Sequence, residues 1–530
     1  MGTVGKKDRG LSVKKKRLAA IDIGTNSIRS IVVEADRDGT FRVLDDEKAT
    51  VRLGDGLHKT GVIAPDSRRR ALEALTRFCK INAGYGVERT EAIATSAVRK
   101  AGNGAEFIRE IQEATGLAVA VISGEEEAEL AALSAFNNFD LDGNRHLLAD
   151  LGGGSLELVT SAGRHLDHVF SLELGAVYLS ETFLPGDSIK ESHLKKLRRH
   201  IRGTLRLAFP GERPLLNSVI GSGGTFTAIA AMIAASRGEA FGSLHGYELL
   251  HADVVHLLAM LSRSTLAERR NIPGLNPDRA DIIVAGVAVV EGLLEFFHGN
   301  LLKINERGIR EGLVLRTLRR NGCGDSDPKR RTWRDAVLEF ATSCNYDAEH
   351  SHHVAGLADR IFGAVAPSHG LGERERELLE AAAILHDIGY FINYTGHHKH
   401  SYHLIRHAEL FGFTPREREL IAQIARYHRK SLPRIKSPEY QRLAKGDRLL
   451  VARLGGILRL ADGLDRRRNS TVTGLQVTGN DARLTFRLQG EGDLSVELFA
   501  AKAKGELFQR AFGHRLVLEP PQPIPLERTS

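Results

Sequence analysis

The 530-residue sequence contains few cysteines and no long apolar run. Its three cysteines, Cys79, Cys323 and Cys344, lie far apart, and no CxxC pair occurs. This pattern argues against a disulfide framework and against a zinc site built from thiolates, and it favours a reducing cytoplasm as the location. No apolar run reaches the roughly 18–20 residues that a membrane-spanning helix requires. The basic N-terminus also lacks the apolar segment of a secretory signal, because Asp22 interrupts the first apolar run.

Patterns typical of nucleic-acid-binding modules are missing too. The sequence has no helix-turn-helix, zinc-finger or RNP pattern, so no specific nucleic-acid partner is expected. Its formal net charge is +8, which fits either an ordinary basic surface or attraction to a polyanion. Much of the positive excess lies in residues 6–17 and 316–334, and this distribution argues against one continuous binding stripe.

The first three fifths of the chain have the pattern of mixed α/β domains. The chain is too long for a single core, and its length predicts three or four domains. Residues 1–16 are predicted to form a disordered basic tail. Residues 17–135 and 136–320 each alternate strand-like and helix-like segments, which predicts two α/β domains. The segment 321–333, rich in Gly, Asp and Pro, is predicted to be a linker.

The C-terminal part follows a different pattern. Residues 334–470 show one helix-like segment after another and no convincing strand, which predicts an all-α domain. Alternating apolar and polar residues return in 471–530, so a small α+β appendix with a Pro-rich tail is expected there.

One strand–turn–strand pattern occurs twice in the α/β part. Residues 18–34 and 146–160 each contain an apolar strand, an aspartate, a tight Gly/Ser turn and a second apolar strand. Asp22 corresponds to Asp150 in this alignment of the two copies. The repetition predicts a duplicated fold with a cleft between its halves.

The two turns, and a third at 219–228, have a composition that suits phosphate binding. Unpaired backbone N–H groups in a Gly/Ser/Thr turn can surround an oxyanion. A single turn of this kind usually only closes a hairpin, but two matched copies and a third favour phosphate. None has the Walker pattern, and the third also lacks the dinucleotide fingerprint. The predicted phosphate-binding residues are Gly24, Thr25, Asn26, Ser27, Gly152, Gly153, Gly154, Ser155, Gly223, Gly224 and Thr225.

Charged residues beside these turns point to phosphate chemistry. An isolated Asp at a strand end often only forms a turn, but the symmetric pair Asp22 and Asp150 next to phosphate favours Mg²⁺. Arg99 follows a strand-like run, and its planar guanidinium can hold phosphate through two hydrogen bonds. The acidic run 125–127 opens a predicted helix. Its glutamates either stabilise the first helical turn or provide a general base that activates water.

These motifs together resemble the actin–sugar kinase–Hsp70 superfamily and, in finer detail, the exopolyphosphatase/guanosine pentaphosphate phosphatase family. They cover residues 18 to about 315 in the order of that family: AAIDIGTNSIRSIV, VRLGDGL with TGVI, ATSAVR, SGEEEA, LADLGGGSLELV and VIGSGGTF. The resemblance implies two duplicated actin-like (ribonuclease H-like) domains. It also implies Glu127 as the general base, with Glu126 as the alternative, and Arg99 as a phosphate contact. Asp150 would help to bind Mg²⁺, with Asp22 and Glu127 as further candidate ligands.

The helical region is rich in histidine. Eleven of the 22 histidines lie between His350 and His428, and a His386-Asp387 pair sits in an apolar stretch. Burying this pair is costly unless the two residues satisfy each other or bind a metal. The spacing resembles the HD-domain phosphohydrolases, which implies a second divalent metal. The implied ligands are His350, His386, Asp387 and Asp462, with His400 and His428 at a second metal position.

Several alternatives stay open in this region. The first ligand is ambiguous, because His352 and His353 closely follow His350. The region could hold a metal and be active, keep a degenerate HD fold without a metal, or be ordinary helical packing.

The leading functional expectation is a Mg²⁺-dependent exopolyphosphatase that releases orthophosphate from inorganic polyphosphate. A phosphohydrolase that removes the terminal phosphate of guanosine pentaphosphate (pppGpp) is the main alternative. Two rivals of other classes are a nucleotide-switched actin-like ATPase module, and an HD-like phosphoesterase with the N-terminal half as its sensor. The expected partners are inorganic polyphosphate and pppGpp, without nucleic acid or membrane, and a homodimer is left open.

Overall fold

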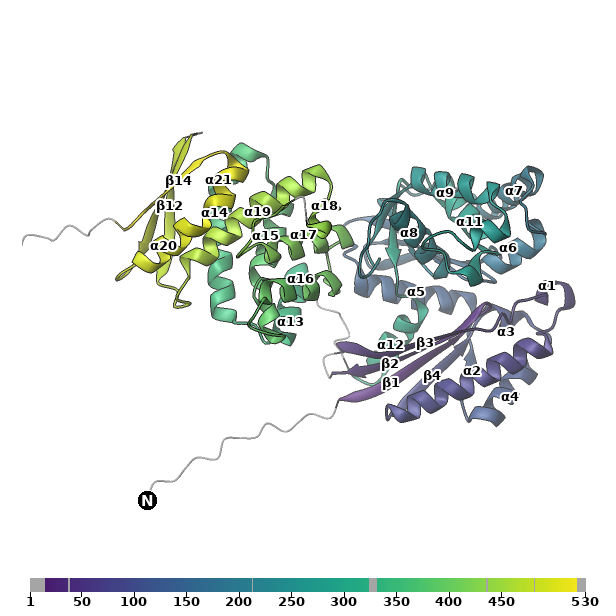
Figure 1. Cartoon of the computed structure of the whole chain (residues 1–530). Coiled ribbons are helices and arrows are strands. Elements are labelled where there is room, and N and C mark those ends of the chain that lie inside the picture. The colour runs from purple at the N-terminus through teal and green to yellow at the C-terminus, as the bar shows by residue number, and fades with distance from the viewer. Residues whose placement is uncertain are drawn as a thin grey trace, which may run out of the picture. The chain divides into compact units, whose positions relative to one another are not determined.

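The computed structural model describes residues 15–36, 39–211, 213–323, 331–434, 437–480 and 482–521. Most of the predicted basic tail, the centre of the predicted linker and the Pro-rich C-terminal tail lie outside these residues. The chain forms two compact units, whose elements are labelled in Figure 1. Unit 1 consists of Met1–Arg237 and Glu248–Lys329, and unit 2 of Gly238–Tyr247 and Arg330–Ser530. The finer domain boundaries given above remain predictions. None of the described helices is long and apolar enough to span a membrane.

The first sheet of unit 1 has the strand order β3-β2-β1-β4-β5. Its first three strands are antiparallel, and the last two run parallel to β1. The strands are β1 (Lys16–Ile23), β2 (Ser27–Ala35), β3 (Phe41–Thr50), β4 (Arg89–Ala94) and β5 (Val119–Val121). The helices that follow them are α1 (Leu57–Thr60), α2 (Pro65–Gly84), α3 (Ser96–Lys100), α4 (Gly104–Thr115) and α5 (Gly124–Asn138).

The central strands of this sheet are apolar on both faces, because both are covered. Ile21 and Ile23 pack with α2 and α4, whereas Leu18 and Ala20, at the alternate positions of β1, face a second cluster. That second cluster contains residues of α12 (Ile309–Arg320). Sheets covered on both faces have nearly continuous apolar strands instead of strict alternation.

The second sheet repeats this arrangement in the order β10-β11-β9-β6-β7-β8. As β1 pairs antiparallel with β2 and parallel with β4, β6 pairs antiparallel with β7 and parallel with β9. The strands are β6 (Arg145–Leu151), β7 (Leu156–Ala162), β8 (His165–Leu172), β9 (Ser218–Ser222), β10 (Glu248–Leu250) and β11 (Leu301–Asn305). The helices are α6 (Ala176–Phe183), α7 (Glu191–Ala208), α8 (Gly224–Ser236), α9 (His251–Arg263), α10 (Leu266–Arg269) and α11 (Ile283–Phe296). The expected duplicated actin-like architecture is therefore confirmed.

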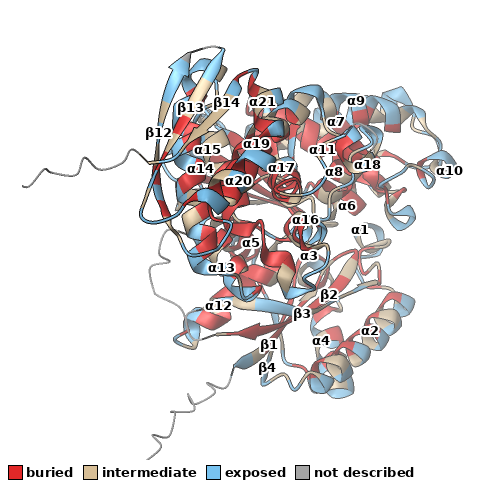
Figure 2. Cartoon of the chain, turned by 60° about the vertical axis from the view of Figure 1, so that its left-hand side comes forward, coloured by how far each residue is buried: buried red, intermediate tan, exposed pale blue. Residues whose placement is uncertain are grey.

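Two helices exchange places between the halves. α5 precedes the second half in sequence, yet its Ala128 and Ala132 pack with Leu148 and Val159 of the second sheet. α12 ends the second half, yet it packs on the first sheet. Both helices carry largely buried residues (Figure 2). A domain boundary at residues 135/136 therefore assigns α5 to the first half by its position in the sequence, although α5 packs on the sheet of the second half.

Unit 2 is helical, with a three-stranded sheet in the order β12-β13-β14. Its helices are α13 (Trp333–Ser343), α14 (Ala348–His369), α15 (Glu373–Leu385), α16 (His397–His407), α17 (Pro415–Arg426), α18 (Pro438–Gln441) and α19 (Lys445–Leu464). The C-terminal appendix consists of β12 (Val472–Asn480), β13 (Arg483–Gly490), α20 (Ser495–Lys504), α21 (Glu506–Phe512) and β14 (Arg515–Glu519). Leu454 and Leu458 of α19 share one continuous apolar core with Phe486 and Phe508 of the appendix.

The segment Gly238–Tyr247 leaves unit 1 after α8 and belongs to unit 2. Arg418 of α17 fixes it, since its guanidinium donates hydrogen bonds to the carbonyl oxygens of Ser243 (3.0 Å) and of Ala408 (3.1 Å). The chain then returns to unit 1 at β10.

Candidate functional site

The two predicted phosphate loops have the same backbone geometry. In the first, the Gly24 N–H donates a hydrogen bond to the carbonyl oxygen of Ser27 (3.2 Å). In the second, the Gly152 N–H donates to the carbonyl oxygen of Ser155 (3.1 Å). Each aspartate lies near the end of an inner strand, two residues before the glycine that opens the turn. The two copies of the sequence repeat therefore close their turns with the same backbone hydrogen bond.

The residues paired with the two aspartates differ. On β2, Arg29 lies opposite Asp22, whereas on β7, Glu157 lies opposite Asp150. The first copy thus combines an acid with a base, and the second combines two acids.

A cavity of about 130 Å³ in unit 1 joins the two loops. Close packing requires glycine in two places. A Cβ on Gly154 would lie 2.6 Å from the Ser96 Oγ, and one on Gly223, whose φ is +96°, would lie 2.8 Å from an Asp150 carboxylate oxygen. Of the predicted site residues, those lining the cavity are Asp22, Gly24, Thr25, Asn26, Ser27, Glu127, Asp150, Gly152, Gly153, Gly154, Ser155, Gly223 and Gly224.

Three predicted residues lie elsewhere. Thr225 is buried and packs against Gly286 of α11, while Thr227 lines the cavity. Arg99 does not line the cavity, but its guanidinium contacts the Glu127 carboxylate (3.3 Å) and donates to the carbonyl oxygen of Ile122 (2.7 Å). Glu126 pairs with Arg316 instead of facing the cavity.

Glu127 and Glu157 are buried and Asp22 and Asp150 half-buried, and desolvation raises the pKa values of these carboxyls. The pKa of Asp22 rises to about 6 despite the charges of Arg29 and Arg310. The pKa of Asp150 also rises to about 6, through burial and the nearby charge of Asp22. One Asp22 carboxylate oxygen is buried without a hydrogen-bond partner among the described residues. Two close carboxylates with an orphaned oxygen fit a divalent cation with oxygen ligands, such as Mg²⁺.

Glu127 and Glu157 form the acidic side of the cavity. Burial, and then the charge of Glu157, raise the pKa of Glu127 well above its usual value, while Arg99 opposes this shift. Burial raises the pKa of Glu157 to about 8, although Ser155 and Ser171 donate hydrogen bonds to it. The sequence analysis did not single out Glu157, but its place opposite Asp150 in the repeat could have identified it.

Four arginines that the sequence analysis did not single out also line the cavity. They are Arg29, Arg279, Arg307 and Arg310. Burial lowers the pKa of Arg29, and burial together with Arg29 lowers the pKa of Arg279 to about 10. Concentrated, desolvated guanidinium groups fit a multiply charged anion. Arg29 stands within the first repeat, whereas Arg279 ends a 3-10 helix, and Arg307 and Arg310 lie before and within the first turn of α12.

A second cluster of ionisable side chains lies in unit 2. His386, His397 and His428 each donate from Nδ1 to the carbonyl oxygen three residues earlier, at 2.7, 3.0 and 2.7 Å. Their Nε2 atoms therefore face Asp387, at 3.6, 3.1 and 3.5 Å from its carboxylate oxygens. Arg429 also donates to the Nε2 atom of His397 (3.1 Å). A tautomer fixed by Nδ1, with no proton on Nε2, is the arrangement that metal-binding histidines use.

His350, the first of the three candidate histidines, lies at this cluster beside His386 and Asp387. Its Nδ1 contacts Asp465 at 2.7 Å, and its Nε2 lies 3.7 Å from Asp462 and 3.9 Å from Asp387. His352 instead contacts the Tyr346 hydroxyl. The Nε2 atoms of His350 and His386 and one Asp387 oxygen are buried without hydrogen-bond partners among the described residues.

His397, and not the predicted His400, joins this cluster. Two groups, His350–His386–Asp387 and Asp387–His397–His428, bring their ligand atoms within 4.8 Å of one another. α16 begins at His397, so His400 lies about 300° further around the helix and only His397 reaches Asp387.

Charges around the cluster keep its carboxylates ionised. Burial opposes this, but the nearby histidines hold the pKa of Asp387 well below its usual range, and Lys504 and His350 do the same for Asp462. Arg468 pairs with Asp387, and Lys504 with Asp462. Burial lowers the pKa of His428 to about 3, so its imidazole is neutral and able to bind a metal.

Comparison with known proteins gives consistent matches. Residues 32–321 match the Ppx/GppA phosphatase family, and residues 333–497 match domain III of the Ppx/GppA phosphatases. An exopolyphosphatase from Cytophaga hutchinsonii is similar with 28% identity and a TM-score of 0.55, over 58% of this chain and 100% of that one. A Ppx/GppA family member from Aquifex aeolicus is similar with 27% identity and a TM-score of 0.51, over 58% and 99% of the two chains. An exopolyphosphatase-like protein shows 29% identity and a TM-score of 0.54, over 58% and 99%.

Proposed function

Because the chain belongs to the Ppx/GppA phosphatase family, we propose that it is a Mg²⁺-dependent exopolyphosphatase. It would hydrolyse the terminal phosphoanhydride bond of inorganic polyphosphate and release orthophosphate. The observation that carries this proposal is the buried Glu127, which lines the same cavity as both phosphate loops. A buried carboxylate beside a phosphate site can activate water, and hydrolysis needs no other acceptor.

The residues that line the cavity would have different roles in the reaction. The N–H groups of the two loops would hold the terminal phosphoryl group, and the arginines would hold the neighbouring phosphates. Asp22 and Asp150 would hold Mg²⁺, which neutralises charge on the phosphoryl oxygens. Glu127 would accept the proton of the attacking water, with Arg99 at 3.3 Å as the residue that positions its carboxylate. Burial raises the pKa of Glu127, which makes its ionised carboxylate a stronger base.

A comparison of Glu127→Gln with Glu125→Gln tests this assignment. Glu125 is exposed in the same helical turn and does not line the cavity. With long-chain polyphosphate and Mg²⁺, we expect Glu127→Gln to lower the rate of orthophosphate release by about 10²–10⁴-fold. Glu125→Gln should keep the wild-type rate. Absence of orthophosphate release by the wild type, or an unchanged rate in Glu127→Gln, would contradict the proposal.

The alternative substrate within the family's chemistry is pppGpp. Both substrates end in a phosphoanhydride-linked phosphoryl group, so the phosphate loops would treat them alike. Competition of pppGpp against long polyphosphate in one assay ranks them by kcat/KM. A higher kcat/KM for pppGpp would show that pppGpp, and not polyphosphate, is the main substrate.

We also propose that the cluster in unit 2 binds a divalent metal, because its buried histidine and aspartate atoms lack partners among the residues that the structure describes. Metal content measured by mass spectrometry tests this directly. We expect His386→Ala and His397→Ala to lose metal relative to the wild type, and His400→Ala, on the same helix as His397, to retain it. Equal metal content in all three variants, or a metal-free wild type after growth with Mn, Fe and Zn, would exclude the site.

A further inference from the structure

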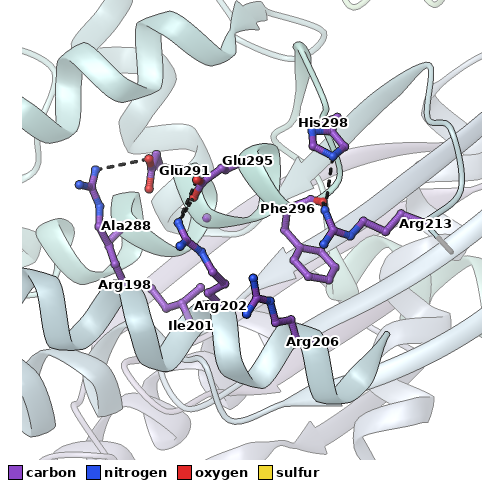
Figure 3. Close-up of a pocket in the computed structure, with 11 residues that line it drawn as sticks. Arg198, Ile201, Arg202, Arg206, Arg213, Ala288, Glu291, Glu295, Phe296 and His298 are labelled. Atoms are coloured by element: carbon purple, nitrogen blue, oxygen red, sulfur yellow. Dashed lines mark hydrogen bonds and ion pairs between the residues drawn. The ribbon is translucent and has the colours of Figure 1, made fainter. Parts of the chain in front are cut away.

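Helices α7 and α11 of unit 1 form a ladder of ion pairs. Arg198, Arg202 and Arg206 follow one another at four-residue spacing and so lie along one side of α7. Arg198 contacts Glu291 at 3.3 Å, and Arg202 contacts Glu295 at 2.9 and 3.0 Å (Figure 3). These two rungs balance two arginines with two acids.

The ladder ends before its third arginine. α11 stops at Phe296, so no third acid of that helix stands opposite Arg206. Arg213 occupies this end instead, where it donates to the carbonyl oxygen of Phe296 (2.9 Å) and stacks 4.2 Å from the centre of the Phe296 ring. Among the residues that the structure describes, neither Arg206 nor Arg213 has a carboxylate partner. Two exposed guanidinium groups therefore face the same hollow without a balancing charge (Figure 3).

This hollow is a cavity of about 240 Å³, which we call the arginine pocket. It shares no lining residue with the cavity of the phosphate loops. Gly292 lets α11 approach α7 closely at this pocket, because a Cβ there would lie only 2.9 Å from Ile201. The pocket is lined by Arg198, Ile201, Arg202, Arg206, Arg213, Ala288, Glu291, Gly292, Glu295, Phe296 and His298.

α11 connects this pocket to the phosphate loops. The helix begins directly after Ile282, which lines the cavity of the phosphate loops. The other end of the helix lines the arginine pocket. Its 14 residues span about 21 Å. Gly286 on the same helix packs against Thr225 of the third loop. A ligand in the arginine pocket would therefore bind the far end of a rigid element that contacts the catalytic loops.

We propose that the arginine pocket is a second binding site for phosphate groups, held chiefly by Arg206 and Arg213. The recognising chemistry is charge-assisted hydrogen bonding from guanidinium to phosphate oxygens. The phosphate could come from an inner stretch of the polyphosphate whose end lies in the catalytic cavity, and this source rests on the proposed function. The second source is a separate short phosphate such as pyrophosphate, acting as an effector.

Binding measurements on the full chain test the site itself. Glu127→Gln serves as the background, so that the ligand is not consumed, and tripolyphosphate is titrated by calorimetry in the presence of Mg²⁺. We expect two sites, and we expect Arg206→Ala to weaken only one of them by about tenfold or more, as loss of a charge-assisted hydrogen bond predicts. Arg199→Ala, on the same helix but outside the pocket, should leave both sites unchanged. Identical isotherms for Arg206→Ala and Arg199→Ala would overturn the proposal.

Kinetics separate the two sources of phosphate. If the inner polyphosphate chain fills the pocket, Arg206→Ala in the otherwise wild-type chain raises KM for long chains severalfold and leaves KM for tripolyphosphate unchanged. If an effector fills it, pyrophosphate changes the wild-type rate and this response is lost in Arg206→Ala. A wild type without any phosphatase activity that still binds tripolyphosphate through Arg206 would refute the proposed function alone. An active wild type with Arg206-independent binding and kinetics would refute the arginine pocket alone.

Discussion

The two strand–turn–strand copies of unit 1 share a backbone and differ in charge. Both close their turn with the same Gly-to-Ser hydrogen bond, and both bring an aspartate to one cavity. Opposite that aspartate, however, the first copy has Arg29 and the second has Glu157. Duplication thus provides the same turn twice, whereas a single position on the neighbouring strand makes one side cationic and the other acidic.

The difference suggests a division of labour between the copies. The cationic side is suited to the negative charge of a phosphate chain, and Arg310 strengthens it near Asp22. The acidic side joins Glu157 to Glu127 and Asp150. In the proposed function this side holds the divalent cation and the attacking water. Four predictions test this asymmetry, from the largest expected effect to the smallest.

Replacing the two aspartates should give unequal losses. Asp150→Asn removes a ligand from the acidic side, and we expect kcat for orthophosphate release to fall by about 10²–10³-fold. Asp22→Asn leaves the neighbouring arginines in place, and a loss of about tenfold is expected. Steady-state kinetics across a Mg²⁺ titration measure both. Equal losses with equal shifts in Mg²⁺ dependence would remove the functional distinction between the copies.

Removing the cation of the first copy should act mainly on binding. We expect Arg29→Met to raise KM for polyphosphate by about tenfold, because a buried guanidinium no longer offsets phosphate charge. The kcat value should change less. Arg109→Met, an exposed position on α4, serves as the control. An effect confined to kcat would place Arg29 in the chemical step instead.

The buried acids predict how stability depends on pH in the metal-free protein. An acid with a raised pKa binds its proton more tightly when folded, so its contribution is present at low pH and is lost as pH rises. Burial raises the pKa values of Asp22 and Asp150 to about 6 and that of Glu157 to about 8. The melting temperature should therefore fall by a few degrees between pH 5 and about 8.

Glu157→Gln isolates the upper part of this window. The amide that replaces the carboxyl at position 157 cannot ionise. The melting temperature of the variant should therefore decline less than that of the wild type between pH 6 and 8. Glu125→Gln should follow the wild-type curve there, since its carboxyl is exposed and its pKa is lowered. Parallel curves for Glu157→Gln and the wild type would show that Glu157 does not carry this dependence.

The matched serines should give the smallest contrast. The Ser155 hydroxyl donates to Glu157, so Ser155→Ala should lower kcat about fivefold through loss of one hydrogen bond. In the first copy no acid lies opposite Asp22, so Ser27 has no matching carboxylate to contact. Ser27→Ala should therefore change kcat about twofold or less. Initial rates at saturating polyphosphate measure both, and a larger effect of Ser27→Ala would reverse the assigned roles.

Local features of the site could be predicted from the sequence, and long-range features could not. The glycines of the turns and the two aspartates are fixed by short-range backbone geometry, so the repeat located them. Glu157 and Arg29 stood within the same motifs, but strand register determines which residues face the aspartates. Arg279, and the neighbouring Arg307 and Arg310 at the start of α12, lie far along the chain from both repeats, and no local pattern links them to the cavity.

The same distinction applies to the fold and to unit 2. Alternation and helical spacing predicted the two sheets and the helical region, yet not the exchange of α5 and α12, which depends on packing. The His386-Asp387 pair was recognised from its neighbours in sequence. His397 was missed because the choice between it and His400 depends on where α16 begins and on its rotation towards Asp387.

The segment Gly238–Tyr247 has a consequence for how the chain folds during synthesis. The Ser243 carbonyl oxygen receives its hydrogen bond from Arg418, which follows it by 175 residues. At ribosomal rates of about 5–20 residues per second, the segment waits roughly 10–35 s for this partner. Unit 1 must therefore fold while the segment Gly238–Tyr247 still lacks its partner Arg418, because unit 2 has not yet been synthesised. A fragment that ends near residue 323 would lack Arg418 and so lose this hydrogen bond, which makes the fragment a poor substitute for the full chain.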